Sequence, residues 1–384
     1  MHRRRLLQLL LLSPALAPAL ARAERRSLPF PLVGPYNYAL RKNYPTAYRY
    51  LNVVDIGHGE LAEVLITNRR GEEYAVHRLE QVAFERVRAM FLDPRRAPRL
   101  QPHEETVAPE SVKVAWKLSQ AFDWTHILHR QIYDILAADF SPEQKDQYIR
   151  ESYNWYLSEP ENAFPGRLKT HDLMEHQWFS QYWRERYPRF NGAIWAYHWY
   201  QLRLNEVMLE PERTARNAAV AEATNEFRAM FETPELLPKH MPMAHSIAPT
   251  FRSRFPEITD AFDNLHMFHD IYNDILAHPQ IPDKRAEVYK QLEEFRKPDE
   301  ALETAPLEPL PADLTREDHR RLNQLTHLEH MAMMLMPTAE QVEFFRQSPE
   351  VRAQVVQKLR PEMVRHWPNL EKKHPAGHEH QHQH

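Results

Sequence analysis

The sequence predicts an all-α protein, a multi-helix bundle that contains an internally duplicated helical hairpin. The chain has 7 glycines and 31 prolines among 384 residues, whereas sheets built from hairpins depend on glycine-rich turns. The stretch at residues 121–136, AFDWTHILHRQIYDIL, is similar to the stretch at residues 261–276, AFDNLHMFHDIYNDIL. The two align without a gap. Their apolar residues recur at helical spacing. These two observations predict both the fold class and the duplication.

The duplicated unit is predicted to be a helical hairpin that covers residues 121–158 and 261–298. In each copy a helix ending is followed by a proline and a new amphipathic start, ILAADFSPEQK in the first and ILAHPQIPDKR in the second. Two copies are too few for a solenoid, whose units need stacked neighbours. We therefore expect the copies to face each other around a pseudo-two-fold axis.

Residues 1–23 are predicted to be a secretory signal peptide. They have a basic start, an apolar stretch and a small-residue ending at Ala23. The apolar run is short and is interrupted by Pro14 and Pro18, so we do not expect it to span a membrane. Residues 3–7, RRRLL, also partly fit a twin-arginine export signal. The protein is therefore expected to be exported, either periplasmic or secreted.

Composition excludes several classes of partner and cofactor. The chain has no cysteine, which rules out disulfides, thiolate metal sites, iron–sulfur clusters and covalently attached c-type haem. The formal net charge is −4 and the pI is about 6.7, so we expect no nucleic-acid partner. The sequence gives no indication of an oligomeric state.

Four parts are predicted along the chain. Proline and tyrosine are frequent before residue 50, where an extended path is expected, and the pattern of residues 51–92 fits helices better than a hairpin around residues 68–71. Residues 93–110 read as a proline-rich linker. The predicted parts are the signal peptide (1–23), an extended or helical amino-terminal segment with its linker (24–110), a helical metal-binding bundle (111–347), and a carboxy-terminal helix with a histidine-rich tail (348–384).

Beyond the linker, prolines separate one predicted helix from the next. Pro142, Pro211 and Pro282 stand where a first-turn proline belongs. The predicted helices are 111–138, 142–158, 168–186, 190–209, 211–232, 256–277, 283–296, 315–335 and 338–347.

The repeated helix carries the residues that suggest a metal site. Residues three and four apart share one face of a helix, so Asp123 lies on the same side as His126 and His129. A histidine- and glutamate-bearing stretch follows each hairpin, THDLMEH at 170–176 and THLEH at 326–330. The predicted metal ligands are Asp123, His126, His129, His171, Glu175, His176, Asp263, His266, His269, His327 and His330.

This ligand pattern resembles that of ferritin-like di-iron bundles. Those proteins present Glu-x-x-His from two helices and one Glu from each of two others, and here Asp-x-x-His occurs twice, with Glu175, Glu206 and Glu329 as candidate bridges. The sequence uses the shorter Asp and adds a second histidine. His171-x-x-x-Glu175 also resembles an element of hemerythrin-like di-iron proteins. Each resemblance covers single helices and assigns no family.

Further residues are candidates either for supporting the ligands or for binding the metal themselves. His58 is flanked by two of the few glycines, and His198 lies in the aromatic run WAYHWYQ, where a core role is equally compatible. Tyrosines near the repeated histidines would act as hydrogen-bond donors or oxidisable neighbours. The candidates are Tyr133, Asp134, Tyr272, Asp274, His198, Glu206, His58 and Glu63.

The carboxy-terminal stretch KKHPAGHEHQHQH has no apolar residue that could anchor a fold. We expect it to be disordered and able to load metal. Its predicted metal-loading residues are His378, His380, His382 and His384. The methionine run 331–336 is interpreted as core.

The predicted function is that of an exported metalloprotein with a histidine/carboxylate centre, expected to hold two metal ions. Iron is the favoured metal, with copper, zinc or manganese as alternatives. The activity would be redox or oxygen-related, as in a non-haem metal oxidoreductase, with a small oxidant or small-molecule substrate as partner. The open alternatives are a metal carrier or storage protein, a non-covalent haem b protein, and a structural partner in a larger complex.

Overall fold

The structure is a computed structural model that describes residues 30–297 and 307–371. The described residues from 31 onward belong to one compact unit. Its elements are all helical, with no strand among the described residues, so the predicted all-α fold class is confirmed. The signal peptide and the histidine-rich tail, predicted at residues 1–23 and 372–384, lie outside the described residues.

The first half of the bundle runs to residue 156. Residues 39–43 and 45–50, for which an extended path is predicted, are helical; Tyr44 separates the two helices, and Pro45 takes the first turn of the second, long one. The predicted helices between residues 51 and 92 are confirmed. The elements are α2 (Ala39–Asn43), α3 (Pro45–Thr67), α4 (Glu72–His77), a π-helical stretch η1 (Arg78–Ala83), α5 (Phe84–Leu92), α6 (Glu104–Val107), α7 (Pro109–Ala137) and α8 (Pro142–Tyr156).

The second half is built in the same way, from helices joined by short connections. The helix predicted at 168–186 is broken into two short helices, because Gln181 adopts a left-handed conformation with φ 70° before the second one. The elements are α9 (Asp172–Glu175), α10 (Tyr182–Arg186), α11 (Pro188–Val207), α12 (Arg213–Glu232), η2 (Pro234–Leu236), α13 (Ala244–Ile247), α14 (Pro249–Arg254), α15 (Pro256–Ala277) and α16 (Lys284–Arg296).

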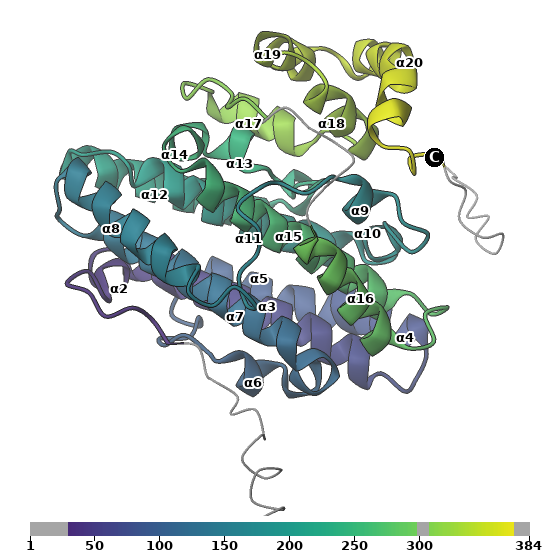
Figure 1. Cartoon of the computed structure of the whole chain (residues 1–384), viewed down its shortest axis with the longest axis horizontal. Helices are drawn as coiled ribbons and strands as arrows, with labels where there is room; N and C mark the ends of the chain where they lie inside the picture. The colour runs from purple at the N-terminus through teal and green to yellow at the C-terminus, as the bar shows by residue number, and fades with distance from the viewer. Residues whose placement is uncertain (1–29, 298–306, 372–384) are drawn as a thin grey trace, which may run out of the picture. The chain divides into compact units, whose positions relative to one another are not determined.

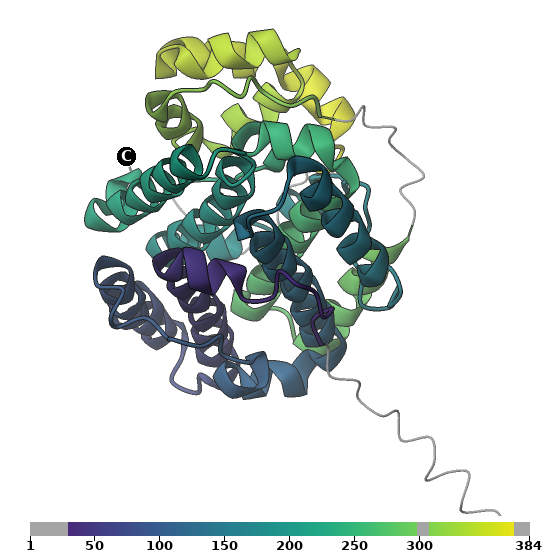
Figure 2. The ribbon, with the colours of Figure 1, turned by 90° about the vertical axis from the view of Figure 1, so that its left-hand side faces the viewer.

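The carboxy-terminal helices have an apolar core of their own, which includes Leu322, Met331 and Phe345. The helix predicted at 315–335 is split in two, because Thr326 and Glu329 form a capping box that starts a new helix. Figures 1 and 2 both show these helices grouped together on one side of the bundle. They are α17 (Arg316–Asn323), α18 (His327–Met334), α19 (Thr338–Arg346) and α20 (Pro349–His366).

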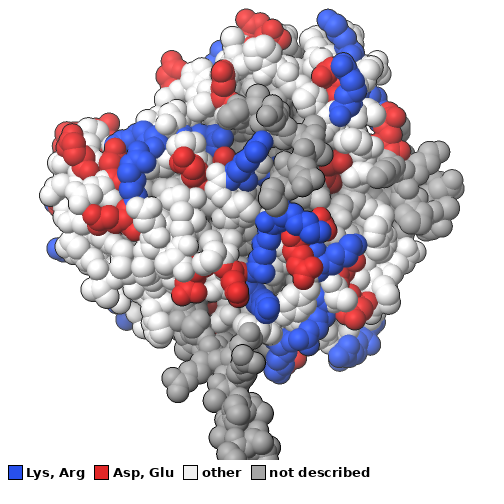
Figure 3. All heavy atoms as spheres, viewed as in Figure 1, with Lys and Arg blue, Asp and Glu red and all other residues white. Residues whose placement is uncertain are grey.

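Four long helices, α3, α7, α11 and α15, meet in the main core (Figure 1). Residues 190–202 of α11 and 261–276 of α15 are buried on every face, which is typical of a central helix. The polar side chains of these two helices are therefore enclosed in protein. None of the described helices combines the length and the apolarity that a membrane crossing requires. On the face shown in Figure 3, acidic and basic side chains are interspersed.

The segments that precede the two predicted hairpins share unusual backbone geometry. Ala108 and Ala248 precede helices with φ/ψ of −135°/57° and −131°/57°. Ala115 breaks α7 with −144°/60°, and Phe255 separates α14 from α15 with −139°/60°. The two residues of each pair are separated by the same number of positions as the two copies of the sequence repeat. The matching breaks support the duplication, which itself stays a prediction.

One acidic residue near the end of each repeated helix caps a short helix. Asp134 accepts two backbone N–H hydrogen bonds of 2.8 Å at the start of α2. Asp274 accepts two, of 2.9 and 2.7 Å, at the start of α10. These bonds satisfy amides that a helix leaves unpaired at its first turn. The donors are the amides of Tyr38 and Leu40 for the first cap, and those of Gln181 and Trp183 for the second.

The pH dependence of stability can be tested at His319, in α17. Burial chiefly, with a smaller effect of Arg203, lowers its pKa to about 3, although Asp318 opposes this shift. The unfolded chain, with a histidine pKa of about 6.5, then binds more protons than the folded one between these two values. Stability should therefore fall as the pH drops below about 6.5, by up to about 1.4 kcal/mol per pH unit from this group.

We expect His319→Leu to flatten the slope of unfolding free energy against pH between pH 6.5 and pH 4, measured by denaturant titration of metal-free protein. The exposed His77→Leu variant is the matched control and should keep the wild-type slope. An unchanged slope in His319→Leu would mean that this imidazole is already charged in the folded protein.

Candidate metal centre

Six histidine side chains gather where the four long helices meet. Two come from α7 and two from α15, the helices that contain the repeated stretches, and one each from α3 and α11. We call them the core histidine cluster, and all six are among the residues singled out from the sequence. They are His58, His126, His129, His198, His266 and His269.

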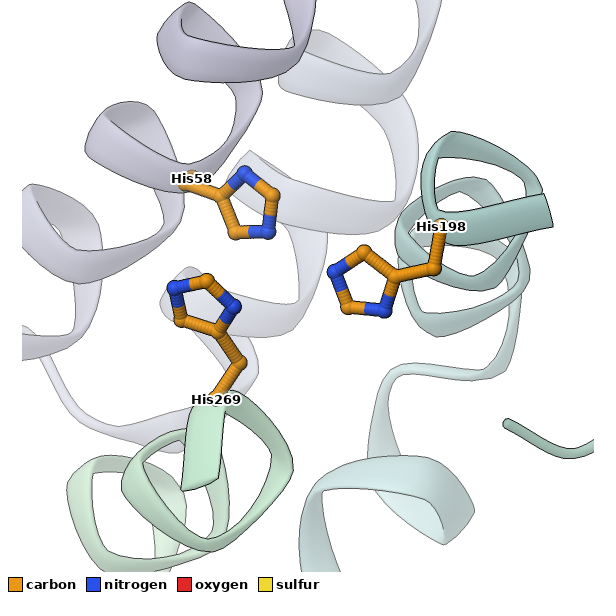
Figure 4. Close-up of side chains that lie close together, drawn as sticks. All are labelled: His58, His198 and His269. Atoms are coloured by element: carbon orange, nitrogen blue, oxygen red, sulfur yellow. The ribbon is translucent and has the colours of Figure 1, made fainter. Parts of the chain in front are cut away.

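Three of these residues form a group that could hold a metal ion. One ring nitrogen of each of His58, His198 and His269 lies within 4.8 Å of the other two. The ring centroid of His58 is 4.7 Å from that of His269 and 5.6 Å from that of His198. Figure 4 shows the three rings converging from α3, α11 and α15. A sequence pattern could not pair these residues, because they come from three separate helices.

The other three rings extend the cluster in both directions from this trio. His126 lies 5.5 Å from His269 between ring centroids. His266 stacks on His198 with a centroid distance of 4.0 Å and an interplanar angle of 11°, and His129 follows 5.7 Å from His266. The predicted face of His126 and His129 therefore does meet the corresponding face of the second copy.

Two glycines bring α3 close enough for His58 to join the cluster. A Cβ added at Gly57 would lie 2.7 Å from a ring carbon of Tyr197 in α11. At Gly59 it would lie 2.7 Å from a methyl carbon of Val107. Both distances are shorter than real Cβ contacts, so the glycines flanking His58 are required by close helix packing.

Burial keeps the cluster uncharged. It lowers the pKa of His58 to about 4 and that of His266 to about 3. The pKa values of the other four histidines are also lowered well below their usual range, chiefly by burial and secondly by neighbouring histidines. Neutral imidazole is the form that binds metal. The cluster is thus ready for ligation at neutral pH.

Several ring nitrogens of the cluster are buried without a hydrogen-bond partner. Both nitrogens of His129, His198 and His266 are in this state, as are His58 Nε2 and His269 Nδ1. An unsatisfied buried polar atom costs about 1–3 kcal/mol. His58 Nδ1 lies 3.0 Å from the carbonyl oxygen of Val54, an arrangement that leaves Nε2 as the free lone pair. A bound cation would satisfy such lone pairs.

A small cavity of about 40 Å³ adjoins the trio. Its walls include His58, His126 and His269, together with the carboxylates Asp55 and Asp123. A cavity of about 10–15 Å³ is enough for one water molecule, so this one accepts only very small molecules. Asp55 already forms an ion pair of 2.6 Å with Arg130.

Most of the other predicted carboxylates bind backbone amides. Asp263 accepts from the Ala244 amide at 3.2 Å, and burial raises its pKa to about 8. Glu63 accepts from two amides at the start of α7, and Glu206 from two at the start of α14. Asp134 and Asp274 are the helix caps described above. The structure thus brings the histidines of the two repeated helices together, whereas these carboxylates serve as caps.

The two predicted tyrosines flank the cluster. Tyr133 stacks on His129 with ring centroids 5.8 Å apart. Tyr272 lines the small cavity, and its hydroxyl lies 2.7 Å from Ser111 Oγ. Tyr197, which the sequence did not single out, has its ring centroid 5.9 Å from that of His58.

A second group of histidines lies around α9, α13 and α18. It contains the predicted residues His171, His176, His327 and His330, with Glu175, and two that sequence reasoning missed, His240 and His245. The ring centroids of His240 and His330 are 4.1 Å apart. Neither missed histidine stands at helical spacing from another histidine, so no periodic signal marked them. The tail histidines lie outside the described residues.

His198→Leu tests whether the trio is built for a cation. Without metal, we expect the variant to unfold at higher denaturant concentration, with a gain of about 1 kcal/mol, because two unpartnered buried nitrogens are removed. With metal, it should lose at least tenfold in affinity, measured by competition with a chelator. The matched control His77→Leu should change neither value. A variant that binds metal like the wild type would exclude His198 as a ligand.

Glu206→Ala separates a capping role from a ligand role. We expect unfolding free energy to fall by about 1–3 kcal/mol, because the amides of Thr250 and Phe251 lose their acceptor. Metal content should stay at the wild-type level. The exposed Glu222→Ala on α12 serves as control. Loss of metal from a folded Glu206→Ala protein would restore this residue as a ligand.

Comparisons of the chain with protein-family models, with curated proteins and with solved structures found no match. The function is therefore inferred from the residues of this chain and their geometry alone.

Proposed function

We propose that the protein is an exported metalloprotein whose bundle holds a redox-active transition metal, iron in the first place, on His58, His198 and His269. The observation that carries the proposal is the convergence of three imidazole nitrogens within 4.8 Å of one another in the core. Folding has already removed these rings from water, so metal binding requires no further desolvation of the imidazoles.

The donor set narrows the choice of metal. Imidazole suits iron, copper, zinc and nickel, whereas manganese prefers oxygen donors. Asp123 shares the cavity wall with His58 and His269, and sites that combine imidazoles with one carboxylate are typical of non-haem iron. When bound, such an ion supplies one-electron and oxygen chemistry. The other three imidazoles of the cluster, those of His126, His129 and His266, extend beyond the trio, which favours the two-ion centre.

The surroundings of the trio support a redox role. The ring of Trp195 lies 5.6 Å from that of His198, and the ring of Tyr197 lies 5.9 Å from that of His58. Both aromatic residues are fully buried. They separate the cluster from bulk water and place oxidisable rings beside it.

The cavity limits what could react there. At about 40 Å³ it suits dioxygen, peroxide or water as the exogenous partner. Pockets for larger organic ligands measure roughly 300–1,000 Å³, and a porphyrin needs space on that scale. This size difference is why haem b does not form part of the proposal.

A metal carrier or storage protein is the second candidate function. The second group of histidines and the histidine-rich tail sequence favour it, since both add imidazoles beyond those of a single centre. A carrier should exchange its ions readily, whereas a redox centre should retain them and change oxidation state.

The decisive experiment measures metal in full-length protein whose tail histidines are replaced by alanine. We expect one to two equivalents of iron to survive dialysis against a chelator, and the visible spectrum to change reversibly with reductant and air. The substitutions are His374→Ala, His378→Ala, His380→Ala, His382→Ala and His384→Ala.

The same protein with His198→Ala is the control, and it should lose the retained metal. Retained zinc without any redox change would replace the redox proposal by a structural or carrier role. Complete loss of metal from the tail-substituted protein would refute a resident core centre.

A further inference from the structure

His176 and His327, here called the outer histidine pair, meet head to head in the second group of histidines. His176 follows α9 directly, and His327 is the first residue of α18. Their Nε2 atoms are 3.3 Å apart, and their ring centroids 5.4 Å. The two residues are separated by 151 positions along the chain, so tertiary structure alone creates this contact.

The second nitrogen of each ring faces a carboxylate. His176 Nδ1 lies 2.9 Å from Asp172 Oδ1, and His327 Nδ1 lies 3.4 Å from Glu175 Oε2. A carboxylate oxygen only accepts hydrogen bonds, so the ring proton of His176 is best placed on Nδ1. His327 Nδ1 makes no hydrogen bond, and the charge of the nearby Glu175 carboxylate is what favours a proton there. A neutral ring has one proton, and both Nε2 atoms are then lone-pair acceptors that point at each other. With both protons on Nδ1, two acceptors at this distance need a cation between them, whereas a proton on His327 Nε2 would give a direct hydrogen bond.

The distance between the two Nε2 atoms fits a metal ion bound by both, and it is also that of a long hydrogen bond. Two nitrogens bound to one ion at about 2.0–2.1 Å, in a tetrahedral arrangement, lie about 3.3–3.4 Å apart. Metal-binding histidines also typically donate their second nitrogen to a carboxylate, which is the arrangement of His176 with Asp172, whereas His327 Nδ1 lies near Glu175 without a hydrogen bond to it.

We propose that the outer histidine pair is a second metal site, separate from the core cluster, which binds a divalent transition-metal ion through the two Nε2 atoms. Asp172 and Glu175 orient the rings and do not themselves bind the ion. The remaining coordination positions belong to water or to an exogenous ligand, because the His327 side chain is 14 % exposed.

Local charge favours a cation at this position. Glu175 is held ionised by Arg184, whose guanidinium donates to both of its carboxylate oxygens at 2.9 and 3.0 Å. Asp172 accepts from the backbone amide of Asn369 at 3.2 Å in addition to facing His176. These two carboxylates and one guanidinium leave one negative charge for the ion to offset.

Arg184 and Trp195 stand between this site and the core cluster. The Arg184 guanidinium lies 5.9 Å from the ring centroid of Trp195, whose ring in turn packs 5.6 Å from that of His198. The two metal sites therefore do not share a ligand. Removing the ligands of one should leave the other able to bind.

Cobalt(II) titration of the tail-substituted full-length protein tests the proposal, after chelator treatment and with visible absorption as the readout. We expect His176→Ala/His327→Ala to bind one equivalent fewer than its parent, with the same circular dichroism. His198→Ala should keep the outer equivalent, and the exposed His77→Ala should bind like the parent. Failure of the core site would thus be distinguishable from failure of this one.

A milder variant keeps the test decisive if the double substitution does not fold. Asp172→Asn keeps both ligands but loses the oriented carboxylate, so cobalt affinity at this site should fall by about 10–100-fold. His327→Ala, at the partly exposed ligand, should abolish the site. Unchanged stoichiometry and affinity in these folded variants would overturn the proposal and leave a shared proton as the cation between the rings.

Discussion

The enclosure of neutral imidazoles between α3, α7, α11 and α15 is the constraint on which the rest of the structure depends. Polar groups withdrawn from water cost free energy unless they find partners, and in the core histidine cluster several ring nitrogens have none. Ordinary cores place apolar residues at such positions. A cluster of this kind is explained if a cation supplies the missing partner, and the proposed function rests on that point.

The acidic residues show how the helices are held around the cluster. Glu63, Glu206, Asp134 and Asp274 each accept two backbone amides at a helix start. Each bond links helices that are distant in sequence, so the caps fix where one helix begins relative to another. Precise placement of helix starts in turn fixes the rings, since ligand geometry tolerates only small displacements.

The core cluster and the outer histidine pair represent two ways of preparing imidazole for metal. In the core, burial and the neighbouring histidines keep the rings neutral, and few hydrogen bonds orient them. In the outer pair, Asp172 orients the His176 ring, Glu175 lies 3.4 Å from His327 Nδ1, and the His327 side chain is partly exposed. The first arrangement is suited to a retained ion in a confined cavity, and the second to an ion that enters from outside.

The sequence by itself determined the helical fold class and the repeated helix, because composition and periodicity are local properties. It also indicated His126, His129, His266 and His269, since spacing of three places residues on one helix face. Tertiary structure alone decided that His58 and His198 complete the cluster, that His176 meets His327, and that Asp134 and Asp274 are caps. Carboxylates that bind metal and carboxylates that cap helices look identical in a sequence, because only the position of distant amides distinguishes them.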